Sequence, residues 1–132
     1  MPHRAILVVE DVFLIRMDLE SSLEEAGFKV VSAPNAQLAI EIFDAGPSKI
    51  RGLVTDIRLG PGKLGWEIAR YMRRSDPAMP VVYVSGDGAA SWAEQGVPNS
   101  VMIAKPFAMT QITMALANLL NQQSPIHPGN VS

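Results

Sequence analysis

A chain of 132 residues is the length of one ordinary domain, and with 48% hydrophobic and 18% charged residues it can bury a proper core, which excludes a disordered chain. The absence of cysteine excludes disulfides, thiolate metal sites and cysteine nucleophiles. A net charge of −2, the lack of a membrane-length apolar run and the lack of a signal peptide argue against nucleic-acid binding and membrane insertion, so we expect a cytoplasmic protein.

Short apolar runs alternate with helical patterns in the first half of the chain. Residues 5–9 form a continuous apolar run rich in β-branched residues, which is typical of a strand buried on both faces. Apolar residues at helical spacing follow, and Gly27 marks the end of that helix. A second strand is predicted over residues 29–33. A second helix, capped by Asn35, ends at Gly46-Pro47.

The alternation continues in the second half of the chain. A third strand over residues 52–56 finishes on the carboxylate of Asp56, and a third helix ends near residues 75–77. The remaining predicted elements are a strand over residues 80–85, a short helix around residues 89–95, a brief strand over residues 101–103 and a last helix over residues 108–121. Residues 122–132 hold two prolines and a glycine, which predicts a flexible C-terminal tail.

This order of elements predicts the fold class. Five buried strands need helices on both faces, so we expect an α/β protein with a doubly wound, five-stranded parallel sheet and about five helices. Ligands of such sheets bind beyond the carboxyl ends of the strands, where the strand order reverses.

Polar side chains stand where the predicted strands end. Glu10-Asp11 follow the first strand, Asp56 and Ser85 end the third and fourth, and Lys105 follows the fifth. Crowded carboxylates repel one another, and a Mg²⁺ ion, which prefers oxygen ligands, would relieve that repulsion. An ammonium and a hydroxyl could neutralise a phosphoryl group that a carboxylate accepts as nucleophile. The simpler interpretations, a helix-capping acidic pair and a surface lysine, do not explain why all these positions coincide.

Four stretches resemble a known family: Leu7-Val8-Val9-Glu10-Asp11, Leu53-Val54-Thr55-Asp56, Val82-Tyr83-Val84-Ser85-Gly86 and Ile103-Ala104-Lys105-Pro106-Phe107. Together and in this order, they resemble the receiver domain of two-component response regulators over about residues 5–121. The resemblance implies a flavodoxin-like sheet of order 2-1-3-4-5, with a receiver domain over residues 1–121 and the tail over residues 122–132.

The resemblance also implies how the site binds metal. Asp11 and Asp56 would bind Mg²⁺ directly, together with the backbone carbonyl of Arg58. Glu10 would act through metal-bound water.

The resemblance also implies that Asp56 accepts the phosphoryl group. Ser85 and Lys105 would bind the phosphoryl oxygens. The Lys105-Pro106 peptide is a candidate for the cis form. The donor would be a phosphohistidine on a sensor histidine kinase or a phosphotransfer protein. The chain would then be a phosphoacceptor signalling domain in a phosphorelay, and not an enzyme in the usual sense.

Met102 departs from the family pattern, in which a tyrosine or phenylalanine usually stands three residues before the lysine. The aromatic switch that couples the hydroxyl residue to the output face in this family is therefore absent in its usual form. This departure supports an alternative function, a receiver-like interaction module that works without phosphorylation. Two further classes fit less well. An aspartate-based phosphatase usually needs a second aspartate where this chain has Arg58, and a flavin site would place phosphate beside Glu10-Asp11.

The predicted last helix carries no charge, since residues 106–132 contain no Asp, Glu, Lys or Arg. Its apolar residues exceed one core stripe: Ile112, Ala115, Leu116 and Leu119 form the stripe, and Met114, Ala117 and Leu120 lie largely outside it. Such a surface favours an interface for a homodimer or another partner, and the alternative is an ordinary uncharged helix with its polar residues outward.

Overall fold

A five-stranded parallel sheet forms the centre of the computed structural model, which describes residues 4–59, 64–86 and 91–123. The strands are β1 (Ala5–Val9), β2 (Lys29–Ala33), β3 (Ile50–Asp56), β4 (Val81–Ser85) and β5 (Val101–Ala104). Their order, β2-β1-β3-β4-β5, confirms the predicted fold class and topology. Val9 of β1 lies opposite Thr55 of β3, so the chain leaves both strands at the same level of the sheet.

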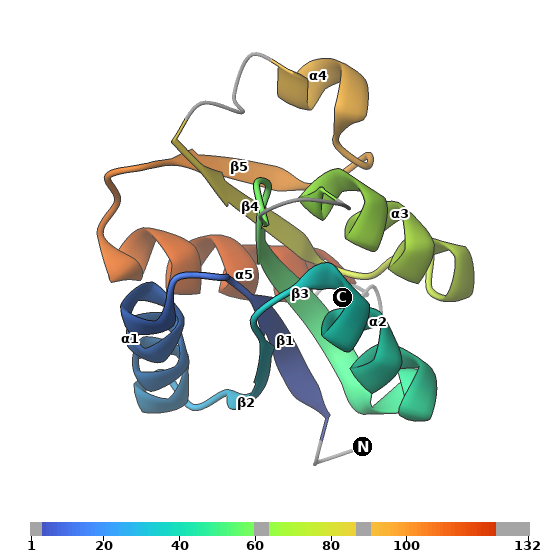
Figure 1. Cartoon of the computed structure of the whole chain (residues 1–132), viewed down its shortest axis with the longest axis horizontal. Coiled ribbons are helices and arrows are strands. Elements are labelled where there is room, and N and C mark those ends of the chain that lie inside the picture. The colour runs from blue at the N-terminus through green and yellow to red at the C-terminus, as the bar shows by residue number, and fades with distance from the viewer. Residues whose placement is uncertain (1–3, 60–63, 87–90, 124–132) are drawn as a thin grey trace, which may run out of the picture.

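Helices cover both faces of the sheet (Figure 1). They are α1 (Phe13–Glu25), α2 (Ala36–Ala45), α3 (Gly65–Ser75), α4 (Trp92–Gln95) and α5 (Met109–Gln123), with a short 3₁₀ helix, η1 (Pro47–Lys49). Figure 1 shows α1 and α5 on one face, α2 and α3 on the other, and the single turn of α4 beyond β5. No helix in the described ranges is long and apolar enough to span a membrane.

Burial of both faces of the sheet explains why its strands read as unbroken apolar runs. Leu7 and Tyr83 belong to the core beneath α2 and α3, whereas Ile6 and Val82 belong to the core beneath α1 and α5. Alternate residues of one strand therefore enter different cores, so most strand positions on both faces are apolar.

Local signals in the sequence set most element boundaries. Gly27 has a positive φ of 99°, which ends α1 as predicted, and the side chain of Asn35 accepts the amide hydrogen of Leu38 at 2.8 Å to cap α2. β3 begins at Ile50, two residues earlier than predicted, because Ile50 pairs with Ala5. The predicted helix around residues 89–95 is confirmed only over Trp92–Gln95, since residues 87–90 lie outside the described ranges, as does most of the predicted tail.

Candidate functional site

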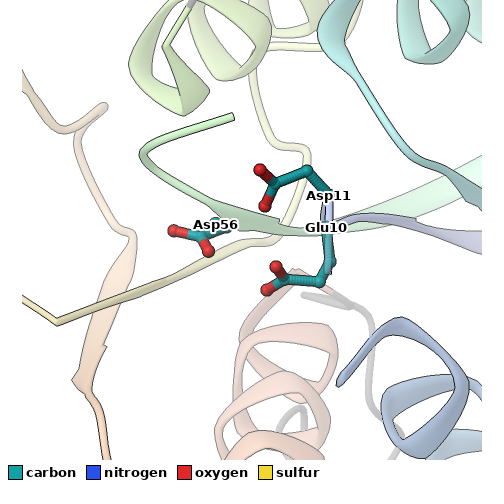
Figure 2. A group of neighbouring side chains, drawn as sticks. All are labelled: Glu10, Asp11 and Asp56. Carbon is teal, nitrogen blue, oxygen red and sulfur yellow. The ribbon is translucent and has the colours of Figure 1, made fainter. Parts of the chain in front are cut away.

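Three carboxylates gather at the carboxyl ends of β1 and β3 (Figure 2). Glu10 and Asp11 directly follow β1, Asp56 is the last residue of β3, and one oxygen from each lies within 4.8 Å of the others. Glu10 and Asp56 are buried, whereas Asp11 is exposed. The cluster therefore opens to solvent on the side of Asp11.

Backbone contacts hold the acidic turn in place. The amide of Glu10 donates to the carbonyl of Ala33 at 3.1 Å, which prolongs the β1–β2 ladder by one residue. The guanidinium of Arg16 donates to the carbonyl of Glu10 at 2.8 Å, and the amide of Val12 donates to Oε2 of Glu10 at 3.1 Å. These contacts fix Glu10 in its buried position.

Lys105 brings a positive charge to the cluster from β5. Its Nζ lies 2.8 Å from Oδ2 of Asp56 and 3.6 Å from Oε1 of Glu10. Its amide donates to the carbonyl of Ser85 at 2.8 Å, and the Lys105–Pro106 peptide is cis, as predicted. Burial lowers the pKa of Lys105, but its contacts with Asp56 and Glu10 outweigh that effect and raise the pKa above its ordinary value.

Glu10 keeps one oxygen unsatisfied. Its Oε1 is buried and accepts no hydrogen bond from the residues that the structure describes, since Nζ of Lys105 at 3.6 Å is too far for one. Burial raises the pKa of Glu10 to about 7; the Val12 amide and Lys105 oppose the rise, and the charge of Asp56 adds to it. A buried, unpaired oxygen among three carboxylates fits a hard divalent cation such as Mg²⁺.

The start of α3 packs closely against the carboxyl end of β3. Gly65 donates its amide to the carbonyl of Ile57 at 2.8 Å, and a Cβ at position 65 would lie 2.3 Å from the carbonyl oxygen of Asp56. The amide of Arg58 donates to Oδ1 of Asp56 at 3.2 Å. Both oxygens of the Asp56 carboxylate thus contact the protein, one through Arg58 and the other through Lys105.

The structure brings together the acidic and basic residues that the sequence predicted, namely Glu10, Asp11, Asp56 and Lys105. Ser85 is buried at the end of β4, level with Ala104 of β5. At Arg58 the structure records the contact of the amide with Asp56, and the metal-ligand role of its carbonyl stays a prediction.

Two supporting residues were missed by the sequence reasoning. Arg16 contacts the site through the Glu10 carbonyl, and nothing in the sequence distinguishes it from a solvated helix residue. Gly65 marks the start of a helix in the sequence, but its close approach to Asp56 depends on how α3 packs.

Comparisons with known proteins point to one family. The profile of the response regulator receiver domain matches residues 6–117. The C4-dicarboxylate transport transcriptional regulatory protein DctD of Rhizobium meliloti (strain 1021) is 30% identical over 113 residues, which are 84% of this chain and 24% of DctD. The transcriptional regulatory protein CusR of Escherichia coli (strain K12) is 27% identical over 92% of this chain and 53% of CusR. The chain thus spans about a quarter and about half of these two regulators.

A solved structure agrees in fold and sequence. The response regulator receiver protein from Sinorhizobium medicae WSM419 superimposes with a TM-score of 0.87 and 42% identity, covering 91% of this chain and 96% of that one. Three observations point to the same family. They are the profile match over most of the chain, the strand order and the cluster of three carboxylates beside a lysine. The chain therefore belongs to the response regulator receiver domain family, whose members are phosphoacceptor signalling modules.

Proposed function

We propose that Asp56 accepts a phosphoryl group in a Mg²⁺-dependent reaction of a two-component phosphorelay. The observation that carries this proposal is the contact of 2.8 Å between Nζ of Lys105 and Oδ2 of Asp56, inside a cluster of three carboxylates. A lysine so placed offsets negative charge where a phosphoryl group would add more.

The chemistry follows from the positions of the side chains. An oxygen of Asp56 attacks the phosphorus of a phosphohistidine, the P–N bond breaks, and the donor imidazole leaves with its electron pair and takes up a proton. Lys105 and the hydroxyl of Ser85 bind the phosphoryl oxygens. Glu10, Asp11, Asp56 and the carbonyl of Arg58 would hold Mg²⁺, Glu10 through water. When bound there, the ion would offset negative charge on the transferred group.

The start of α1 offers a surface for the phosphodonor. Four large apolar side chains are exposed there: Val12, Phe13, Leu14 and Met17. Leu14 is 71% exposed, and Val12 directly follows Asp11. We infer that this α1 apolar patch contacts the sensor histidine kinase or phosphotransfer protein, because a donor must cover the acidic cluster to reach Asp56. Such donors draw their phosphate from ATP, so we expect the protein in the cytoplasm.

A homodimer through α5 stays a prediction. The helix exposes fewer large apolar side chains than the sequence suggested. Leu120 packs partly against the core beneath α1 and α5, and Met114, 64% exposed, is the large apolar side chain that α5 leaves in solvent among its described residues. Sedimentation of the phosphorylated and unphosphorylated chain at high concentration tests it, and a strict monomer in both states would exclude it.

The acceptor assignment can be tested with a small phosphodonor. Wild-type protein mixed with Mg²⁺ and acetyl phosphate is expected to form an acid-stable, base-labile phosphoprotein, and Asp56→Asn is expected to form none. Omitting Mg²⁺ should suppress the labelling. Asp18→Asn is the matched control, because Asp18 is an exposed carboxylate on α1 outside the cluster.

Two outcomes would contradict the proposal. Equal labelling of wild type and Asp56→Asn would show that another residue accepts the phosphoryl group. No labelling of wild type by small donors or by histidine-phosphorylated proteins would favour an interaction module that works without phosphorylation.

A further inference from the structure

Side chains hold residues 92–100 in place, a stretch before β5 in which α4 is a single helical turn. We call residues 92–100 the α4 segment. The indole Nε1 of Trp92 donates to the hydroxyl of Ser100 at 3.0 Å, and that hydroxyl donates to the carbonyl of Val97 at 2.6 Å. The indole ring lies against Gly96, where a Cβ would approach Cδ1 of Trp92 to 2.4 Å. The segment is therefore folded back on itself around Trp92.

Two arginines of α3 bind the same segment. Arg70 donates to the carbonyl of Gln95 at 2.9 Å, and Arg73 donates to the carbonyl of Pro98 at 2.7 Å. Arg73 also donates to the carbonyl of Met79 at 2.8 Å, just before β4. These bonds join the α4 segment to the helix beside it.

A third connection comes from the core. The amide of Val97 donates to the hydroxyl of Tyr83 at 3.0 Å. Tyr83 lies in the middle of β4, is fully buried, and packs edge-on against Trp66 with ring centroids 4.6 Å apart. A buried ring in such packing has little freedom to rotate, so its hydroxyl follows any displacement of β4.

The carboxyl end of β4 lies at the proposed phosphoacceptor site. The carbonyl of Val84 accepts the amide of Ile57, next to Asp56, at 3.2 Å, and the carbonyl of Ser85 accepts the amide of Lys105 at 2.8 Å. A phosphoryl group on Asp56 adds charge and acceptor oxygens beside Lys105 and the end of β4. The strand that carries Tyr83 is thus hydrogen-bonded both to Ile57, which follows Asp56, and to Lys105.

We propose that Tyr83 is a positioning residue whose hydroxyl, through the Val97 amide, sets the conformation of the α4 segment according to the phosphorylation state of Asp56. This inference rests on the proposed function. Tyr83 would give the chain a link from the site to its surface that needs no aromatic residue at position 102, where Met102 lies opposite Tyr83 in the β4–β5 register.

The experiment compares Tyr83→Phe with wild type by amide NMR, before and after phosphorylation with acetyl phosphate and Mg²⁺. In wild type, phosphorylation is expected to shift the amide signals of the α4 segment and to change the exchange rate of the Val97 amide by roughly two- to tenfold, the effect of one hydrogen bond. Tyr83→Phe should still be phosphorylated on Asp56, which shows that it folds, but its α4 segment should no longer respond.

Tyr71→Phe is the matched control, since the chain has two tyrosines and the hydroxyl of Tyr71 bonds Asp44, away from this link. It should respond as wild type does. A phosphorylated wild type with an unchanged α4 segment, or a Tyr83→Phe variant that responds fully, would overturn the inference alone. A wild type that takes up no label from acetyl phosphate or from histidine-phosphorylated proteins would refute the proposed function and this inference with it.

Discussion

Glu10 and Lys105 both lie beside Asp56 and are both at least partly withdrawn from solvent. Glu10 is fully buried with one oxygen unpaired, and Lys105 reaches Asp56 at 2.8 Å and Glu10 at 3.6 Å. One ammonium therefore faces two carboxylates, and the site without metal keeps an excess of negative charge. A metal ion and a phosphoryl group would each meet a site whose charges are arranged before they bind.

The raised pKa of Glu10 gives a prediction with a definite sign. Because its pKa rises from 4.5 to about 7 on folding, the folded state binds more protons than the unfolded state between these two values. The free energy of unfolding without metal should therefore fall as pH rises from about 5 to about 7. Urea unfolding in EDTA measures this slope. Glu10→Gln should flatten the slope. Equal slopes for wild type and variant would show that Glu10 does not cause this pH dependence.

Lys105→Met tests the contribution of the ammonium to labelling. The variant keeps an unbranched side chain but removes the charge beside Asp56, so labelling by acetyl phosphate should slow roughly a hundred- to a thousandfold, the usual effect of losing one electrostatic donor. The rate of phosphoprotein formation at saturating Mg²⁺ is the measurement. Lys49→Met, at an exposed lysine of η1, should label at the wild-type rate. An unchanged labelling rate for Lys105→Met would show that Lys105 does not contribute to phosphoryl transfer.

The element that sets the geometry of Asp56 is the start of α3. Gly65 lets the helix approach until a Cβ would lie 2.3 Å from the carbonyl oxygen of Asp56, and Trp66 packs against Tyr83 of β4. The same helix reaches the α4 segment through Arg70 and Arg73. α3 is thus in contact with the acceptor strand, with β4 and with the surface segment that we propose to respond.

Gly65→Ala should disturb this arrangement. Since backbone atoms stand within 3.1 Å of the added Cβ, the helix start must shift, at a cost of about 1–3 kcal/mol in the free energy of unfolding. The shift should also slow phosphorylation of Asp56, because the backbone that holds its carboxylate moves. Gly46→Ala is the control, since its Cβ would meet only the flexible side chain of Lys49. Wild-type stability and labelling in Gly65→Ala would show that this approach is unimportant.

At the scale of the whole molecule, the sheet brings residues from distant parts of the chain to one edge. The acidic pair follows β1, the acceptor ends β3 and the lysine follows β5, although Lys105 and Asp56 are 49 residues apart. Because the ends of β1, β3, β4 and β5 meet in the site, a ligand bound there joins segments that the unfolded chain keeps apart. Binding should therefore be coupled to the stability of the entire domain.

Magnesium should raise the free energy of unfolding. At ten times its dissociation constant, the ion is expected to add about 1.4 kcal/mol, because it binds the folded site and not the unfolded chain. Thermal unfolding over a magnesium titration at pH 8, where Glu10 is ionised, measures the effect. Asp11→Asn should lose most of it without destabilising the metal-free protein, since Asp11 is exposed. Equal stabilisation of Asp11→Asn and wild type by magnesium would show that the ion binds outside the cluster.

The sequence by itself determined the alternation of strands and helices, and with it the fold class, because runs buried on both faces must be unbroken and apolar. It also determined which residue types meet at the strand ends, since parallel strands direct their carboxyl ends to one edge. Only the tertiary structure decided the electrostatics, for burial and distance depend on packing: the unpaired oxygen of Glu10, the support of Arg16 and the close approach of Gly65 have no signature in the sequence. The bond from Val97 to Tyr83 likewise exists only because an irregular segment folds over the core.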